Sequence, residues 1–227
     1  MPLKPSLLEL TPDETRERVM ELGGKAFHAK VIRTAVLNKG ILDYQGITSL
    51  SKGVREMLAE EMPILRGREV DRSLAKDGTT KLLIEFPVEG GKNALIETVH
   101  IPSHDEAKGA TLCVSTQVGC PVACPFCASG RLGLERNLSK AEIIEQYLRG
   151  RDIGRLSRSV VMGIGEPLLN LQNLTGALKV VREEIGIGAR KITVSTVGFP
   201  DRLAKLGKTN PGFQLAISLH TPFDDQR

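Results

Sequence analysis

The sequence predicts an α/β protein that carries a small helical module at its amino end. Helix-start signals and glycine-containing turns fill the first 65 residues, an extended period begins at Thr80, and strands alternate with helices from Thr111 onward. Such alternation requires parallel strands and right-handed crossovers, with functional loops at the carboxyl ends of the strands. We expect a helical accessory domain over residues 1–75, a β-hairpin extension over 76–105 and an α/β core over 106–227.

The accessory domain is predicted from local helix signals. Thr11-Pro-Asp-Glu14 is a capping box, which predicts a helix from Pro12 to about Leu22 that stops at Gly23-Gly24. A second helix is expected over 26–38, and a third is expected to start after Ser49 or Ser51. Such a compact module is suited to docking a nucleic acid or a partner, and equally to stabilising the main domain as a cap.

The middle of the chain changes to an extended pattern. Residues 81–86 and 94–101 are rich in branched side chains and flank Gly90-Gly91, which together indicate a β-hairpin. A further strand over 111–116 leads directly into a cysteine-rich loop.

The α/β core follows from the alternation after that loop. A helix is predicted to begin at Ser139, because Glu142 completes a second capping box. The remaining elements expected in chain order are a strand over 158–162, a helix over 171–184, a strand over 191–195, a short helix over 200–206 and a strand over 213–219.

The loop after the first core strand supplies three thiols within eight residues. Cys120, Cys124 and Cys127 form a C-x3-C-x2-C triplet with no fourth ligand nearby, which favours an iron–sulfur cluster with one iron left open. A structural zinc site needs four closing ligands, and a disulfide-dense framework needs more than four cysteines in 227 residues. Zinc and inert buried thiols remain the alternatives.

Polar residues also follow the later strands of the core. Gly165 and Glu166 end one strand, and Glu166 could accept hydrogen bonds from a ligand ammonium. Ser195 ends the next strand, and the run Ser218, Leu219 and His220 ends the last. These residues could line a cofactor pocket, or they could form ordinary turns and helix caps.

Composition sets limits on function. With 41% hydrophobic and 26% charged residues, the chain has the composition of a soluble globular protein, and no apolar run is long enough to span a membrane. The net charge is only +4, but Lys and Arg recur over residues 131–158 and 179–191. Such a distribution would suit a polyanionic substrate, and it is equally typical of solvated helix faces. An aromatic content of 4% argues against rows of base-stacking platforms.

These motifs together carry a resemblance. The cysteine loop resembles that of radical S-adenosylmethionine (SAM) enzymes, and the whole chain resembles the RlmN/Cfr family of 23S rRNA adenine methyltransferases, the RlmN branch best. The segments that carry it are 8–11, 112–120, 163–170, 192–196 and 217–220. The implied fold is a partial, TIM-like radical SAM barrel made of its first four βα units.

The resemblance implies a role for each candidate residue. Cys120, Cys124 and Cys127 would hold a [4Fe-4S] cluster, and Gly165, Glu166, Ser195, Ser218, Leu219 and His220 would contact SAM. Glu97 would be the proton acceptor, and Cys113 would form the transient disulfide that resolves a covalent RNA adduct. Without the resemblance, Glu97 would be read as a solvated hairpin residue, and Cys113 would be equally well explained as a buried core thiol or as a residue with a separate function.

The implied activity is methylation of C2 of an adenine in 23S rRNA and in certain tRNAs. C8 methylation and a non-catalytic Fe–S protein that binds RNA are the alternatives. A flavodoxin or ferredoxin would donate electrons, and the protein would be a cytoplasmic monomer. The family's second non-cluster cysteine and a late SAM-contacting asparagine have no counterpart here, so we expect the chain to be an inactive fragment of a longer enzyme.

Overall fold

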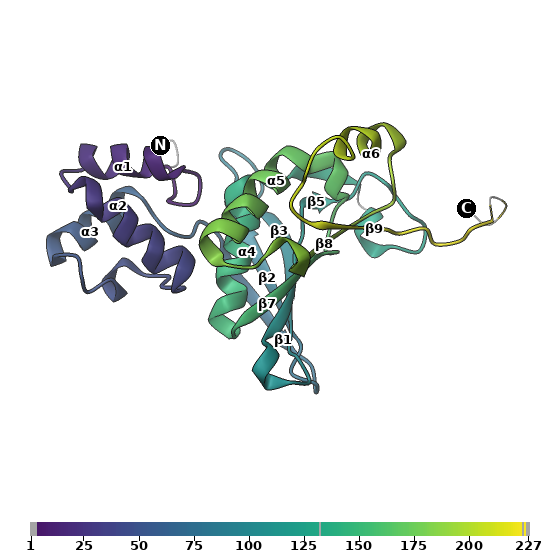
Figure 1. Cartoon of the computed structure of the whole chain (residues 1–227), viewed down its shortest axis with the longest axis horizontal. Coiled ribbons are helices and arrows are strands. Elements are labelled where there is room, and N and C mark those ends of the chain that lie inside the picture. Colours follow the sequence, from purple (N-terminus) through teal and green to yellow (C-terminus); the bar gives the residue numbers. More distant parts are fainter. Residues whose placement is uncertain (1–3, 132, 224, 226–227) are drawn as a thin grey trace.

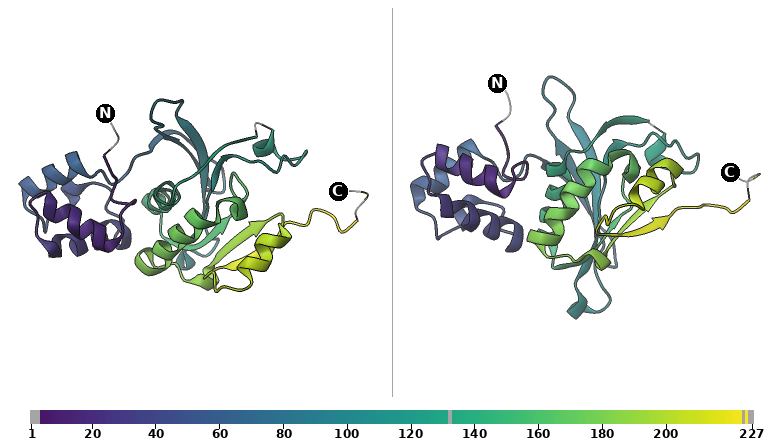
Figure 2. Two further views of the ribbon diagram at one scale, coloured as in Figure 1. Left: turned by 90° about the horizontal axis from the view of Figure 1, so that it is seen from above. Right: turned by 45° about the horizontal axis from the view of Figure 1, so that its top comes forward.

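The computed structural model describes residues 4–131, 133–223 and 225. A helical module lies beside a single large mixed sheet, and the longer helices of the core cover one face of that sheet (Figure 1). The opposite face curves around an open side, as an incomplete barrel does (Figure 2). The α/β class and the partial barrel expected from the sequence are therefore confirmed.

The helical module begins where the local signals predict. Helix α1 has Thr11 as its N-cap, with the Thr11 hydroxyl accepting from the Glu14 N–H at 3.2 Å and the Glu14 carboxylate accepting from the Thr11 N–H at 2.7 Å. Ser51 is the N-cap of α3. The elements are α1 (Pro12–Glu21), α2 (Ala26–Arg33), a π-helical turn η1 (Thr34–Asn38), a 3₁₀ turn η2 (Tyr44–Gly46) and α3 (Lys52–Glu61).

The large sheet has seven strands in the order β1-β2-β3-β4-β7-β8-β9. The first four are paired antiparallel, whereas β4, β7, β8 and β9 are paired parallel. The predicted hairpin is therefore part of the same sheet as the core, through the pairing of β3 with β4. The bounds are β1 (Arg68–Leu74), β2 (Thr80–Phe86), β3 (Ala94–Ile101), β4 (Ala110–Cys113), β7 (Leu156–Val161), β8 (Ile192–Thr196) and β9 (Gln214–Ile217).

Strand β1 was not predicted, and it lies inside the segment assigned to the helical domain. Its residues are mostly exposed on both faces because it is the edge strand, so it lacks the apolar alternation that marks a half-buried strand. A register shift between Glu69 and Asp71 interrupts the pattern further. The sheet therefore begins at Arg68, and the helices of the module end at Glu61.

The core helices cross between the parallel strands as expected. Helix α4 has Ser139 as its N-cap with the full capping box, and its Gly150 packs so closely on the sheet that a Cβ there would lie 2.4 Å from a methyl carbon of Leu112. The elements are η3 (Glu106–Lys108), η4 (Ala128–Gly130), α4 (Lys140–Ile153), η5 (Pro167–Asn170), α5 (Leu171–Val180), η6 (Val181–Ile185), η7 (Ala189–Lys191) and α6 (Pro200–Leu206). Within the described chain no helix is long and apolar enough to cross a membrane.

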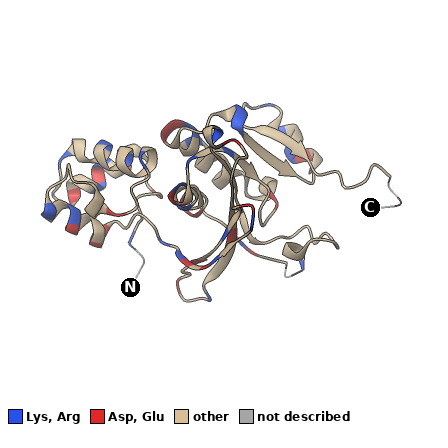
Figure 3. Ribbon diagram, turned by 90° about the horizontal axis from the view of Figure 1, so that it is seen from below, with Lys and Arg blue, Asp and Glu red and all other residues tan. Residues whose placement is uncertain are grey.

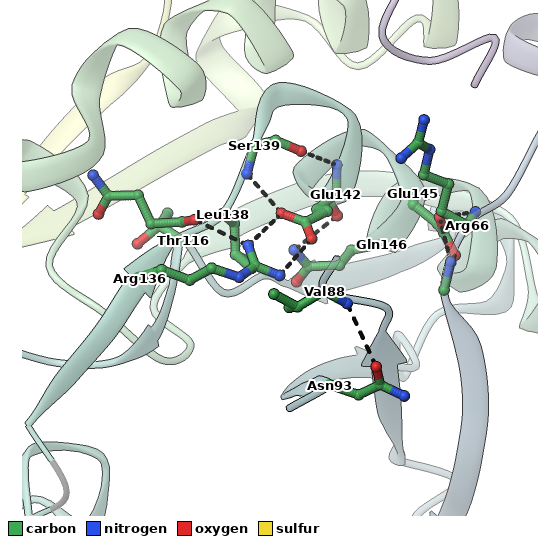
Figure 4. A network of polar contacts seen from close by, with 12 residues as sticks. Arg66, Val88, Asn93, Thr116, Arg136, Leu138, Ser139, Glu142, Glu145 and Gln146 are labelled. Atoms are coloured by element: carbon green, nitrogen blue, oxygen red, sulfur yellow. Dashed lines mark hydrogen bonds and ion pairs between the residues drawn. The ribbon is translucent and has the colours of Figure 1, made fainter. Parts of the chain in front are cut away.

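A buried carboxylate joins the helical module to the core. Glu145 of α4, which is 2% exposed, accepts hydrogen bonds from the backbone N–H groups of Arg66 at 2.8 Å and Gly67 at 3.0 Å (Figure 4). Arg149 balances its charge, with its Nη2 at 2.7 Å from Glu145. This cluster fixes the connection between α3 and β1 against α4.

A second contact joins α2 of the module to the π-helical turn η6 of the core. Arg33, the last residue of α2, forms a two-pronged ion pair with Glu184 of η6, with N–O distances of 2.6 and 2.8 Å. The same guanidinium donates to the Leu10 carbonyl and the Thr15 hydroxyl, both at 3.0 Å. Because the Arg33 side chain is only 7% exposed, this ion pair is shielded from solvent and fixes the orientation of the module.

A buried histidine on β3 predicts a pH-dependent stability. His100 is 6% exposed, neither ring nitrogen has a hydrogen-bond partner on another described residue, and burial lowers its pKa below the ordinary value of 6.5. The unfolded chain therefore binds more protons near pH 6, so the free energy of unfolding falls as the pH drops below about 6.5. Urea titrations at pH 7.5 and 5.5 measure the difference.

The control for this prediction is a histidine that faces solvent. His100→Gln reduces the loss of stability between the two pH values, whereas His104→Gln leaves it as in the wild type, because His104 is exposed. Carboxylates with lowered pKa values, such as Glu69, lose their contribution only below about pH 4.5 and do not enter this range. An unchanged pH dependence in His100→Gln contradicts the prediction.

Candidate active site

Polar side chains, most of them buried, join the ends of the four parallel strands. Ser115, which follows β4, donates its hydroxyl to the Glu97 carbonyl of β3 at 2.6 Å and accepts from the Ile164 N–H beyond β7 at 2.9 Å. Gln146 of α4 pairs through its amide with both backbone groups of Ser115, at 2.8 and 3.0 Å. This arrangement fixes the chain where it leaves β4 for the cysteine loop.

The next link joins the end of β4 to the end of β7. Gln117 is fully buried, and its side-chain oxygen accepts from the Glu166 N–H at 2.7 Å. Gly165 adopts a φ of +110°, and a Cβ there would lie 2.6 Å from Cβ of Gln117. Glycine is therefore required at this position both for its backbone conformation and for the close approach of two loops.

The Glu166 carboxylate joins β7 to β8. Its Oε1 accepts from the Thr196 hydroxyl at 2.5 Å and from the Leu168 N–H at 3.0 Å, while its Oε2 accepts from the Val197 N–H at 3.1 Å. The residue is 3% exposed. We expected a ligand ammonium as the partner of Glu166. Protein donors occupy three of the roughly four acceptor positions of this carboxylate, so at most one position, on Oε2, is left for such a ligand.

The last links join β8 to β9 and return to the cysteine loop. Ser195 and Ser218 are hydrogen-bonded through their hydroxyls at 2.6 Å. His220 adopts a φ of +64° and stacks on Phe126, with ring centroids 4.5 Å apart and an interplanar angle of 14°. The strand ends therefore meet at one edge of the sheet, and the cysteine loop lies against the last of them.

The cysteine loop is held at its base by a small second sheet. Strands β5 (Gln117–Gly119) and β6 (Leu134–Asn137) pair antiparallel on either side of it, an arrangement that the sequence analysis did not predict. Gly119 has a φ of +73°, and a Cβ there would lie 1.9 Å from the Gly133 carbonyl oxygen, so a side chain cannot be accommodated. Within the loop, the Cys127 N–H donates to the Cys124 carbonyl at 3.0 Å.

Arg136 joins this small sheet to the start of α4. Its guanidinium makes two bonds to the Glu142 carboxylate, at 2.7 and 2.8 Å, while Glu142 also accepts from the Ser139 N–H in the capping box (Figure 4). A side-chain pair of this geometry is rigid. The base of the cysteine loop is therefore fixed to the helix that follows it.

The three loop thiols form a suitable donor set for an iron–sulfur cluster. Burial raises the pKa of Cys120, and the nearby Glu166, Cys124 and Cys127 raise it further. Three soft sulfur donors on one short loop are the ligand type and number that a cluster with one open iron takes.

Cys113 and Glu97 both lie on the open face of the sheet. Val99 is paired directly opposite Cys113, and Glu97 lies two residues before Val99, so the three side chains share a face. Burial raises the pKa of the Cys113 thiol above its ordinary value. All four cysteines are free. The structure thus places Cys113 on the face that the cysteine loop adjoins.

Glu97 lines a cavity of about 410 Å³ between β3 and the cysteine loop, together with Val118, Gly119, Ala128 and Ser129 among others. Its carboxylate forms an exposed ion pair with Lys81 of β2, at 2.7 Å. The pair raises the pKa of Lys81. Glu97 is therefore accessible from the cavity, with one carboxylate oxygen engaged by a lysine.

Four residues that organise this edge were missed by sequence reasoning. Ser115, Gln117, Gln146 and Asn170 are all buried, and each makes side-chain hydrogen bonds between different elements. The only signal in the sequence is the polar run Ser115-Thr-Gln117 after an apolar strand, which would normally indicate an exposed turn. Its burial depends on partners far along the chain.

Comparison with known proteins agrees with this geometry. Residues 114–227 match the Radical SAM superfamily. A probable dual-specificity RNA methyltransferase RlmN of Nostoc punctiforme is 42% identical over 227 residues, covering 97% of this chain and 61% of the relative. The protein with the same description from Gloeobacter violaceus is 42% identical over 223 residues, covering 97% of this chain and 62% of the relative.

A solved structure is also similar. The crystal structure of a radical SAM methyltransferase from Sphaerobacter thermophilus superimposes with a TM-score of 0.86 at 37% sequence identity. The match covers 98% of this chain and 66% of the other. The chain thus spans about three fifths of the length of the two curated relatives described above.

The Glu166 contacts predict which hydroxyl on β8 matters for stability. Thr196→Val removes one donor from a buried carboxylate, which costs about 1–3 kcal/mol of unfolding free energy. Thr193→Val on the same strand is the matched control, because the Thr193 side chain has no hydrogen-bond partner among the described residues. Urea unfolding of both variants checks the prediction, and equal losses would argue against a role for the Thr196 hydroxyl.

Proposed function

Because the chain belongs to the radical SAM superfamily, we propose that it is the SAM-cleaving part of an RNA methyltransferase of the RlmN type. The observation that carries this proposal is the closed set of contacts at the strand ends. Glu166 joins β7 to β8, Ser195 joins Ser218, and the His220–Phe126 stack brings the cysteine loop to the same edge. A cofactor and a cluster would therefore meet in one place.

Cys120, Cys124 and Cys127 would hold a [4Fe-4S] cluster. Three protein thiolates would leave one iron open to SAM. When bound, the cluster would supply one electron for the reductive cleavage of SAM to methionine and a 5′-deoxyadenosyl radical. The rigid base of the loop, clamped between β5 and β6, would hold the three thiols in place for this.

SAM would lie along the strand ends that follow β7, β8 and β9. Gly165 and Ser195 would contact it where the loops approach, with Ser218, Leu219 and His220 on the far side. Glu166 would act mainly by positioning these loops, because three protein donors already use its carboxylate. Its remaining acceptor position on Oε2 could receive one hydrogen bond from the SAM ammonium.

The substrate of the whole protein would be an adenine of 23S rRNA, and of certain tRNAs, methylated at C2. Glu97 would accept a proton from the RNA-bound intermediate, since its carboxylate lines a cavity beside the cysteine loop. Cys113 would resolve the covalent adduct. The family's methyl-carrying thiol has no counterpart here, because Cys113 and the three loop cysteines are the only cysteines among the 227 residues. A flavodoxin or ferredoxin would supply electrons to a cytoplasmic monomer.

Reconstitution of the chain with iron and sulfide under anaerobic conditions tests the cluster. The wild type is expected to develop a broad absorbance near about 400 nm, typical of thiolate-bound iron–sulfur centres, with about four irons bound per chain. Cys127→Ala abolishes this absorbance. Cys113→Ser retains it, because Cys113 lies on β4 outside the loop.

Two outcomes of this reconstitution would contradict the proposed cluster. Binding of one zinc per chain without uptake of iron would contradict the proposal, as would loss of the absorbance in Cys113→Ser. With a reductant, the reconstituted wild type is expected to convert SAM to 5′-deoxyadenosine. Absence of this product from a fully loaded chain would exclude the SAM-cleaving function.

A further inference from the structure

A large cavity of the described chain lies between helices α5 and α6. This α5–α6 groove has a volume of about 930 Å³. Side chains of β6, η5, α5 and α6, and of the turn after α6, line it.

The charges in the groove all have one sign. Lys179 and Arg182 come from the α5 side, Arg202 and Lys205 come from α6, and none of the described residues that line the groove is Asp or Glu. In contrast to this groove, the helical module carries basic and acidic residues side by side (Figure 3). Four cations without an acidic neighbour in the lining repel one another, so the groove favours an anionic occupant.

The two arginines are oriented by backbone carbonyls at separate points of the groove. Arg202 donates to the Leu168 carbonyl at 2.8 Å, and Arg182 donates to the Gly212 carbonyl at 3.2 Å. The Arg182 guanidinium lies directly on Gly212, where a Cβ would be 2.5 Å from its Cζ. Each guanidinium has five donors, so both retain N–H groups for a ligand.

The two lysines are uncommitted. Lys179 and Lys205 are exposed, and the side-chain ammonium group of neither one forms an ion pair or hydrogen bond with another described residue. Amide side chains that can donate to phosphate or ribose oxygens accompany them, namely those of Gln172, Asn173 and Asn210. The groove has no aromatic side chain on which a base could stack, which favours recognition of a backbone over recognition of bases.

Part of the groove lies close in sequence to the candidate active site. Asn137 belongs to β6, at the base of the cysteine loop, and Leu169 and Asn170 closely follow Glu166. Asn210 and Pro211, beyond the end of α6, also line the groove. A long polyanion could therefore contact the groove while part of it occupies the candidate active site.

We propose that the α5–α6 groove binds the sugar–phosphate backbone of the RNA substrate outside the active site. This inference rests on the proposed function, because it takes RNA as the substrate. Lys179 and Lys205 contact phosphates, while Arg182 and Arg202 present preoriented donors at separate points of the groove. The contact is independent of base sequence, so it contributes affinity and orientation.

The test measures binding of a labelled 23S rRNA fragment, transcribed in vitro, to the full chain with its cluster reconstituted. Lys179→Glu/Lys205→Glu is expected to weaken binding about tenfold or more near 0.1 M salt. A Lys179→Gln/Lys205→Gln variant lowers the slope of log affinity against log salt by about 1.4, the value for two phosphate contacts on a single strand. Lys76→Glu/Lys108→Glu, on exposed turns elsewhere, carries the same charge change and leaves affinity within about twofold.

Conversion of SAM to 5′-deoxyadenosine without RNA separates this proposal from the proposed function. Equal losses of RNA affinity in the groove variants and in the control pair, or no loss in either, overturn the proposal that the α5–α6 groove binds RNA. Wild-type chain that binds no RNA overturns it as well, while SAM conversion still reports on the radical SAM function. Failure of SAM conversion overturns the function whatever the RNA result.

Discussion

The arrangement of the strand ends depends on one buried carboxylate. Glu166 receives the Thr196 hydroxyl and two backbone N–H groups, and its own N–H is received by Gln117, so three loops meet around a single residue. A buried carboxylate without donors would be strongly destabilising, and this requirement fixes the spacing of β4, β7 and β8 at their carboxyl ends. Gly165 then follows as a necessity, since any Cβ would separate the loops that Glu166 joins.

The fold could be predicted wherever the signals were local. Capping boxes at Thr11 and Ser139 located two helix starts, and Pro200 located a third. Strands β1, β5 and β6 were missed for two reasons. Their pairing depends on partners elsewhere in the chain, and the strands are either rich in polar residues or only three to four residues long. The sequence also showed the hairpin but not its membership of the core sheet, since the pairing of β3 with β4 is a tertiary contact.

The residues of the candidate site also fall into those that local sequence indicated and those that it did not. Spacing alone indicated the three loop cysteines as a donor set, and the strand ends indicated Ser195 and Ser218 as residues that could line one pocket. The hydrogen bond between their hydroxyls, at 2.6 Å, was not predicted. The resemblance to known enzymes was needed for Glu97 and Cys113, whose roles stay predictions. Spacing could not reveal that Glu166 is satisfied by the protein, because its donors lie two, thirty and thirty-one residues further along the chain.

The ion pair between the end of α2 and the π-helical turn η6 has a consequence for the order of folding. Arg33 and Glu184 are separated by 151 residues, and the Arg33 guanidinium also holds Leu10 and Thr15 of the module. Contacts of such separation form late, because the intervening loop must close before they contribute. Helices α1 to α3 can therefore be made early during synthesis, but their final seating waits until α5 and η6 have formed on the sheet.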